Sequence, residues 1–263
     1  MASAYKYITY EENNLTAIIT INRPEVYNAL NIDAKMEIIQ AIREANKNSQ
    51  VRSIILTGAG KAFCTGQDLN DRSVQASQGP IDLGHTLETE WNPLVNALRD
   101  SKKIVIAAVN GVCAGAGVSV VIASDLIISK PLVKFVGAFS KLGLAPDAGS
   151  TYTFVRALGY QKTMEFFLLG APLTSEQMLE ASLVNALSEE PMKLALDYAS
   201  TINKLSPLST EMIKKNIKSS LDSSYNESME REKQAQRFLG NSADYKEGLD
   251  AFLNKREPNF NGH

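Results

Sequence analysis

The chain has few of the residues that mark oxidised, basic or membrane-bound proteins. Cysteine occurs twice in 263 residues, at Cys64 and Cys113, so we expect reduced thiols and a cytoplasmic location rather than a disulfide framework. Lys and Arg number 27 against 29 Asp and Glu, and no dense basic cluster is present to follow a nucleic acid. No apolar run is long enough to span a bilayer, and the polar N-terminal segment lacks the pattern of a secretory signal. We therefore expect neither nucleic acid nor a membrane as a partner.

Histidine is equally scarce, which limits the kinds of catalytic site. A nucleophilic Cys64 would need a base, and His85 and His263 are the only histidines, neither in a recognisable catalytic setting. A thiol nucleophile is therefore the less favoured hypothesis. No grouping of His, Cys and carboxylates has metal-ligand spacing, so we expect no metal and no prosthetic group.

The first two-thirds of the chain alternates apolar strands with helical segments. This length suits one ordinary domain with a helical appendage. Continuous apolar strands between helices favour an α/β fold, because such strands are buried on both faces. Strands are expected at 15–21, 53–57, 103–109 and 125–129, and helices at 32–46 and from about 115.

From Pro146 onward the pattern is mainly helical. A capping box beginning at Thr174 predicts one helix start, and Ser242 is expected to cap the last helix, which runs to about Lys255. Further helices are expected at 190–203, 206–222 and 225–239. We divide the chain into an α/β core over 1–200 and a helical region over 201–263. The polar, non-periodic segment 70–84 is a candidate mobile loop.

Two loops that follow buried strands are rich in glycine and alanine. They are Gly60–Leu69 and Asn110–Gly117, and the second opens a helix whose first N–H groups face outward. Two loops that direct N–H groups at one point form an oxyanion hole. The alternative is that the glycines serve tight turns and close helix–strand packing. A nucleotide-binding loop is disfavoured, because neither segment has the required glycine spacing.

These loops, the turns Asn22–Pro24 and Asn28–Leu30, and the segment Gly143–Gly149 resemble the crotonase superfamily in order over nearly the whole chain. The resemblance implies a crotonase-like spiral of β-β-α units with a C-terminal helical trimerisation region, assembled as a homotrimer or a dimer of trimers. It also implies coenzyme A thioesters as substrates. The N–H groups of the oxyanion hole would belong to Gln67 and Ala116.

The positions of carboxylates differ from those of the hydratases in this superfamily. Hydratases hold two glutamates where this chain has Ser119 and Phe139, neither of which can act as a base. An acid appears instead at Asp147, the position of the catalytic acid in isomerases that shift a double bond. The alternative is that Asp147 only caps a helix beginning near Ala148.

Four further segments resemble the 1,2-epoxyphenylacetyl-CoA isomerases of phenylacetate breakdown. That resemblance would make Asp147 the group that assists epoxide opening, with Phe139 as a wall of an apolar pocket. The alternatives are a Δ3-Δ2-enoyl-CoA isomerase, an enoyl-CoA hydratase of fatty-acid oxidation, and a non-catalytic protein that binds acyl-CoA or RNA. The four segments are 66–72, 92–95, 138–144 and 242–248.

The resemblance also implies contacts with coenzyme A, which enters only as part of the substrate. Phe252 and Lys255 on the last helix would reach it, often from a neighbouring subunit. The alternative for each basic residue is a solvated surface charge. The implied contacts nearer the loops are Arg23, Lys61, Ala62, Asp68 and Leu69.

Overall fold

The larger of two β-sheets forms the base of the molecule. In a computed structural model, which describes residues 5–71 and 82–263, this sheet has the order β1-β2-β3-β5-β7-β10. Only β1 and β2 pair antiparallel within it, and the other neighbours run parallel, as the apolar strands predicted. Its strands are β1 Ile8–Asn13, β2 Thr16–Ile21, β3 Ser53–Gly58, β5 Ile104–Val109, β7 Leu126–Ser129 and β10 Ala186–Leu187.

A second, smaller sheet has the order β4-β6-β8-β9. The pairs β3 and β4, β5 and β6, and β7 and β8 each place one strand in the large sheet and the next in the small sheet. The small-sheet strands are β4 Ala62–Cys64, β6 Val112–Ala114, β8 Lys134–Val136 and β9 Leu173–Thr174. We had expected loops at β4 and β6. Three residues are too few to show the alternating pattern by which strands are predicted.

The helices begin and end close to the predicted residues, because several start at a side-chain cap. Asn31 caps α1 through Ala34, and Thr174 caps α7 with the expected capping box. The helices are α1 Ile32–Lys47, α3 Leu83–Thr86, α4 Asn92–Arg99, α5 Ala116–Ile122, α6 Ser150–Leu169, α7 Ser175–Glu180, α8 Pro191–Ile202, α9 Pro207–Ser220, α10 Tyr225–Leu239 and α11 Ala243–Leu253. The last helix therefore ends two residues before the predicted Lys255, which adopts a left-handed conformation instead (φ 52°).

Helix α8 covers one face of the large sheet. Its Ala195 and Ala199 are fully buried against Ile55, Ile106 and neighbouring strand residues, in an apolar cluster separate from the main core. Such burial contributes about 25 cal/mol for each Å² of apolar surface. Because α8 continues to Ile202, the expected boundary at residue 200 falls in its last turn; the division into two domains stays a prediction.

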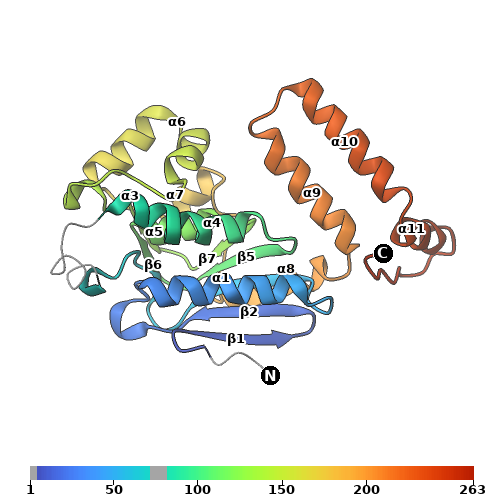
Figure 1. The fold of residues 1–263 in the computed structure, drawn as a ribbon, viewed down its shortest axis with the longest axis horizontal. Helices are drawn as coiled ribbons and strands as arrows, with labels where there is room; N and C mark the ends of the chain where they lie inside the picture. Colours follow the sequence, from blue (N-terminus) through green and yellow to red (C-terminus); the bar gives the residue numbers. More distant parts are fainter. Residues whose placement is uncertain (1–4, 72–81) are drawn as a thin grey trace.

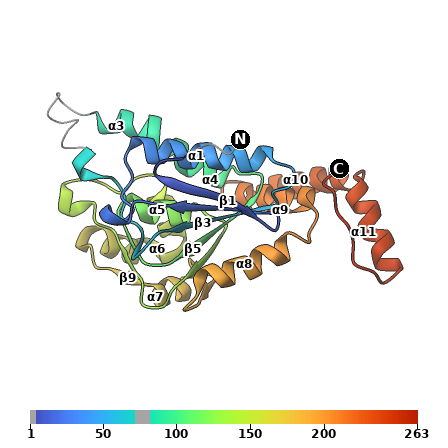
Figure 2. The ribbon, with the colours of Figure 1, turned by 90° about the horizontal axis from the view of Figure 1, so that it is seen from below.

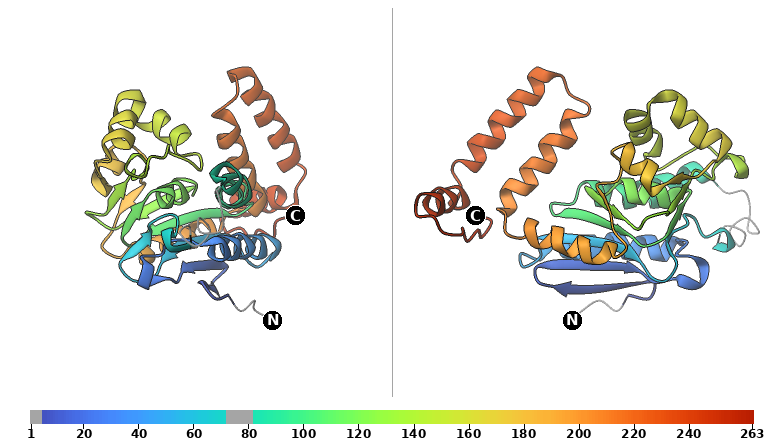
Figure 3. Two further views of the ribbon diagram at one scale, coloured as in Figure 1. Left: turned by 60° about the vertical axis from the view of Figure 1, so that its left-hand side comes forward. Right: turned by 180° about the vertical axis from the view of Figure 1, so that it is seen from behind.

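Helices α9, α10 and α11 extend away from the sheets (Figures 1 and 3). Helix α9 is held at the core by Lys214, whose Nζ lies 2.7 Å from Asp125 Oδ2. Large apolar side chains on these helices remain in contact with solvent, including Ile217, Tyr225 and Phe252. Figure 2 places α11 and α3 at opposite ends of the molecule.

Most of the expected mobile loop over 70–84 lies outside the described residues, which omit 72–81. The described residues on either side, 69–71 and Leu83–Thr86, are helical. Among the parts of the chain that the structure describes, no helix has the length and apolar character needed to cross a membrane.

Candidate active site

The two glycine-rich segments lie side by side in the small sheet. Strands β4 and β6 run parallel, with Ala62 opposite Val112 and Cys64 opposite Cys113. The predicted donors Gln67 and Ala116 each follow their cysteine by three residues. Because the carboxyl ends of parallel strands meet at one edge, the two segments leave the sheet on the same side, where α/β proteins bind ligands.

Glycine allows the two segments to touch through their backbones. A Cβ atom on Gly66 would lie 2.9 Å from the oxygen of Ala114 and 3.1 Å from the nitrogen of Ala116. A Cβ atom on Gly117 would overlap the carbonyl group of Cys64. Both glycines are therefore required by close backbone approach between the segments.

The backbone at Gln67 is oriented by a bridge to Leu30. The N–H of Leu30 donates to the oxygen of Gly66 (2.7 Å), and the N–H of Asp68 donates to the oxygen of Leu30 (3.0 Å). Peptide groups alternate in direction along an extended chain. The N–H of Gln67 therefore points away from Leu30.

Ala116 is the first residue of α5 and is buried, with a relative exposure of 5%. The preceding Gly115 has φ 52° and ψ −133°, so the chain turns sharply before the helix begins. The first N–H groups of a helix have no acceptor within it. Because α5 has only seven residues, its helix dipole is small. The group at Ala116 that could bind a ligand is therefore the backbone N–H itself.

Asp147 is tied to α5 through its backbone. Its carbonyl oxygen accepts hydrogen bonds from Ser119 Oγ (3.1 Å), Ser150 Oγ (2.8 Å) and the N–H of Ser150 (3.0 Å). Ser119 lies three residues after Ala116, so one short helix links a predicted donor to the predicted acid. The half-buried Asp147 is thereby fixed relative to the glycine-rich segment.

Asp147 is not at the cap position of the helix that follows it, which the alternative interpretation of this residue had required. Helix α6 begins at Ser150 rather than near Ala148, and its cap position is Gly149. Ala148 and Gly149 are both left-handed, with φ of 49° and 80°. A left-handed alanine costs about 1 kcal/mol, and strain of this kind is concentrated at functional sites.

The two residues expected at the hydratase glutamate positions carry no carboxylate. Ser119 is fully buried, and its hydroxyl is bonded to the Asp147 oxygen. Phe139 is buried, with its ring centroid 6.1 Å from that of Phe167. It belongs to an aromatic cluster with Phe154, Phe166 and Phe167 of α6, and its role as a pocket wall stays a prediction.

Both cysteines are inside the core. Burial raises the pKa of Cys64 to about 12 and raises the pKa of Cys113 as well. At neutral pH the thiols therefore stay protonated, and a protonated thiol is a poor nucleophile. This geometry does not favour thiol catalysis at Cys64.

Two of the residues predicted to contact coenzyme A bind each other. The guanidinium of Arg23 lies 2.8 Å from Asp68 Oδ2, and both residues are buried. Lys61 and Leu69 are exposed, whereas the buried Ala62 presents its carbonyl to the side chain of Asn28 (2.7 Å). Among these residues, Lys61 and Leu69 are the ones accessible to a ligand in this structure.

Phe252 and Lys255 lie at the other end of the molecule. Phe252 is 81% exposed on α11, and Lys255 follows the end of that helix. Within one chain, α11 is far from β6, the strand that pairs with β4 (Figure 1). A contact between these residues and a ligand at the glycine-rich segments would therefore require a neighbouring subunit.

A buried network beside Gln67 was missed from the sequence. Lys35, which is fully buried, binds Glu90 and Gln67 Oε1 (3.0 Å), and Trp91 Nε1 also donates to that oxygen (3.1 Å). The available signal was a lysine on the apolar face of the predicted helix 32–46, in register with Ile38, Ile39 and Ile42.

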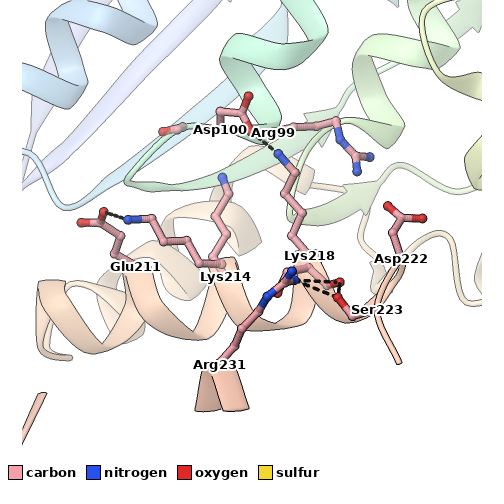
Figure 4. Close-up of a pocket in the computed structure, with 11 residues that line it drawn as sticks. Arg99, Asp100, Glu211, Lys214, Lys218, Asp222, Ser223 and Arg231 are labelled. Atoms are coloured by element: carbon pink, nitrogen blue, oxygen red, sulfur yellow. Dashed lines mark hydrogen bonds and ion pairs between the residues drawn. The ribbon is translucent and has the colours of Figure 1, made fainter. Parts of the chain in front are cut away.

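A cavity of about 380 Å³ lies between the end of α4 and helices α9 and α10 (Figure 4). Its cations are largely engaged within the chain. Lys218 binds Asp100, Lys215 binds Glu211 (2.6 Å), and Arg231 donates to Ser223 Oγ (2.8 Å). Within residues 5–71 and 82–263, no group of three His, Cys, Asp or Glu is placed to hold a metal ion.

The chain is similar to known proteins over nearly its whole length. A family model described as enoyl-CoA hydratase/isomerase matches residues 11–263. The 1,2-epoxyphenylacetyl-CoA isomerase of Escherichia coli is 38% identical over 250 residues, covering 93% of this chain and 94% of its own. A probable enoyl-CoA hydratase of Rhodobacter capsulatus is 34% identical, covering 98% of this chain and 99% of its own.

The fold is also found in solved structures. A crystal structure of an enoyl-CoA hydratase from Polaromonas sp. JS666 superposes with a TM-score of 0.91 at 28% identity, covering 96% of this chain and 99% of that one. The expected crotonase-like α/β fold with C-terminal helices is confirmed.

Proposed function

The chain belongs to the enoyl-CoA hydratase/isomerase family, and we propose that within it this protein is an acyl-CoA isomerase with one catalytic carboxylate, Asp147. The observation that carries the proposal is the environment of Asp147. Its carbonyl is held by Ser119 and Ser150, next to the helix that begins at Ala116. Ser119 and Phe139 stand where a hydratase of this family would have its glutamates.

The chemistry begins at the carbonyl group of the thioester. Removing a proton from the adjacent carbon places negative charge on the carbonyl oxygen. The N–H groups of Gln67 and Ala116 would stabilise that charge, and loss of one such donor typically costs about 3–4 kcal/mol. Because backbone supplies both donors, neither side chain has to be polar.

One carboxylate is sufficient for an isomerisation. Asp147 would take a proton from one carbon and return it to another, so no group is required to activate water. Hydration needs both the water and the α-carbon proton to be handled. A single acid therefore supports isomerisation over hydration.

For the substrate we propose 2-(1,2-epoxy-1,2-dihydrophenyl)acetyl-CoA. The isomerase of Escherichia coli named above, 38% identical, supports this choice. Asp147 would then take the proton from the carbon next to the thioester, the N–H pair would hold the resulting enolate, and the same proton would return to a ring carbon as the epoxide rearranges. A 3-enoyl-CoA ester is the second candidate, because a double-bond shift uses the same acid and the same N–H pair.

Coenzyme A would bind partly across a subunit boundary. Lys61 and Leu69 are exposed within the first glycine-rich segment, whereas Phe252 and Lys255 belong to α11 and the residues just after it, at the far end of the same chain (Figure 2). The distance supports a homotrimer or dimer of trimers in which one subunit completes the coenzyme site of the next. A cytoplasmic location stays a prediction.

A turnover screen tests the proposal. The protein would be assayed with the epoxide, with 3-enoyl-CoA esters and with 2-enoyl-CoA esters, beside the Asp147→Asn variant. We expect isomerisation of the epoxide, a weaker or absent reaction with 2-enoyl-CoA, and loss of turnover in the variant. Hydration of 2-enoyl-CoA as the main reaction, or full activity of the variant, would contradict the proposal.

A further inference from the structure

A buried ion pair supports the side chain of Gln67. Lys35 on α1 has no exposed surface, and it binds Glu90, which is 7% exposed. The ammonium group also donates to Gln67 Oε1 (3.0 Å) and lies 4.7 Å from the centre of the Trp91 ring. Two charged side chains are thus buried next to Gln67, the residue to which we assign one oxyanion N–H.

The network holds Gln67 from several directions. Its Oε1 accepts from both Lys35 and Trp91, and its Nε2 donates to the oxygen of Asp68 (3.2 Å). The residues on either side of Gln67 are bonded to Leu30 through the backbone. Side chain and backbone are therefore fixed by different parts of the fold.

A π-helical turn presents two members of the network. Glu90 and Trp91 end the segment Leu87–Trp91, which has the π-helix hydrogen-bond pattern between α3 and α4. Single π-helical turns within helical segments are uncommon in proteins, and those that do occur are often found at functional sites. The turn places the adjacent residues Glu90 and Trp91 both inside the protein, 7% and 2% exposed.

We propose that Lys35, with Glu90 and Trp91, is a positioning residue for the oxyanion N–H of Gln67. This inference rests on the proposed function. Donor geometry in such a site has a tolerance of about 0.5 Å, so a side chain that anchors the donor residue affects the transition state.

Stability alone is a weak reason for this pair. Replacing a buried ion pair by apolar residues of similar volume is often neutral or stabilising. The chain contains another pair with a buried lysine, Lys214 and the half-buried Asp125, in which the lysine also binds the carbonyl oxygens of Leu98 and Lys103. That pair anchors α9 and makes no contact with Gln67, so it provides a matched control.

The test compares two double variants. Lys35→Met/Glu90→Met removes the proposed positioning pair, and Lys214→Met/Asp125→Asn removes the control pair. The probes are phenylacetyl-CoA, which lacks the epoxide, and acetyl-CoA, each labelled with ¹³C at the thioester carbonyl. Infrared spectroscopy of the bound probe measures carbonyl polarisation, and kcat, KM and the melting temperature are measured in parallel.

We expect the wild-type protein to lower the carbonyl stretching frequency and the Lys35 variant to lose most of that shift. Its kcat should fall about tenfold or more with KM nearly unchanged, as expected for a misplaced oxyanion donor. The control variant should keep the shift and kcat. Lys35→Gln/Glu90→Gln, which retains a donor for Gln67 Oε1, should recover part of both.

An unchanged shift and kcat in a folded Lys35 variant would overturn the inference while leaving the proposed function intact. An absent shift in the wild-type protein with both probes would overturn the proposed function and the inference together. If the Lys35 variant does not fold, Trp91→Phe removes the other donor to Gln67 Oε1. An unchanged carbonyl shift in that variant would also overturn the inference.

Discussion

The two ends of the molecule differ in how many of their side chains find contacts within the same chain. At the glycine-rich segments, the backbone of Gly66 lies close to that of Ala116, and the backbone of Gly117 lies close to that of Cys64. The side chain of Gln67 is held there by a buried hydrogen-bond network. At the C-terminal helices, large apolar residues face solvent, including Phe252 at 81% exposure and Tyr225 at 78%.

This difference separates chemistry from assembly. The proposed donors and acid lie on elements whose geometry is complete within one chain. The proposed coenzyme contacts on α11 are far from them and gain a partner only through another subunit. Changes at the first end should therefore lower kcat, and changes at the second should act through KM and subunit mixing.

The largest effect is expected at Asp147. Asp147→Asn keeps the shape and removes the proton carrier, so kcat should fall about a thousandfold. Acyl-CoA binding, measured by calorimetry, should remain, because the carboxylate is not a proposed coenzyme contact. Asp222→Asn, a change at an exposed carboxylate that binds Tyr152 Oη (2.8 Å), serves as the control and should keep full activity. Loss of binding together with kcat would point to a structural role for Asp147.

The next largest effect is expected at Gly66. A methyl group there meets Ala114 and Ala116, so Gly66→Ala should move the paired segments apart and lower kcat about a hundredfold. Gly143→Ala is the matched control, since Gly143 also has positive φ (70°) but a methyl group there would meet no other atom within 4 Å. Equal losses in both variants would mean that backbone strain, not contact between the segments, governs activity.

A smaller effect is expected at Ser119. Ser119→Ala removes one of three hydrogen bonds to the Asp147 oxygen, and a bond of this kind is worth about 1 kcal/mol. We expect kcat to fall up to about tenfold with little change in KM. Ser124→Ala is a control, because its buried hydroxyl has no partner among the described residues. An equal change in kcat for the two variants would argue that the hydrogen bond from Ser119 to Asp147 does not affect catalysis.

The smallest effect on kcat is expected at the C-terminal end. Phe252→Ser should raise KM for the acyl-CoA several-fold and leave kcat unchanged. Mixed oligomers of this variant and Asp147→Asn should show a low KM again. In them, an active site that retains Asp147 in one subunit can be completed by Phe252 from the Asp147→Asn subunit. A KM that stays high in every mixture would mean that α11 does not serve a neighbouring site.

The sequence predicted most of the fold because its signals were local. Apolar runs gave β2, β3 and β5, and the cap residues Thr174 and Ser242 gave the starts of α7 and α11. The short strands β4 and β6 were not predicted, since their pairing is made by residues about 50 positions apart. The start of α6 was misplaced because two left-handed residues, Ala148 and Gly149, delay it.

The candidate site was predicted as residue types but not as contacts. The resemblance to the crotonase superfamily singled out Gln67, Ala116 and Asp147, whereas the strand-and-loop pattern alone indicated only two glycine-rich segments. Nothing local to Lys35 indicates that it meets Glu90, because the two lie on separate elements 55 residues apart. Likewise, the sequence alone did not reveal that Arg23 binds Asp68.

Isomerisation by one carboxylate, without addition of water, is distinguished from hydration by running the reaction in water enriched in ¹⁸O. The substrate would be whichever ester gives the fastest turnover in the screen, and the product would be analysed by mass spectrometry before any further step. We expect a product of unchanged mass with no ¹⁸O. A product heavier by one molecule of water that carries ¹⁸O would contradict it and identify the protein as a hydratase.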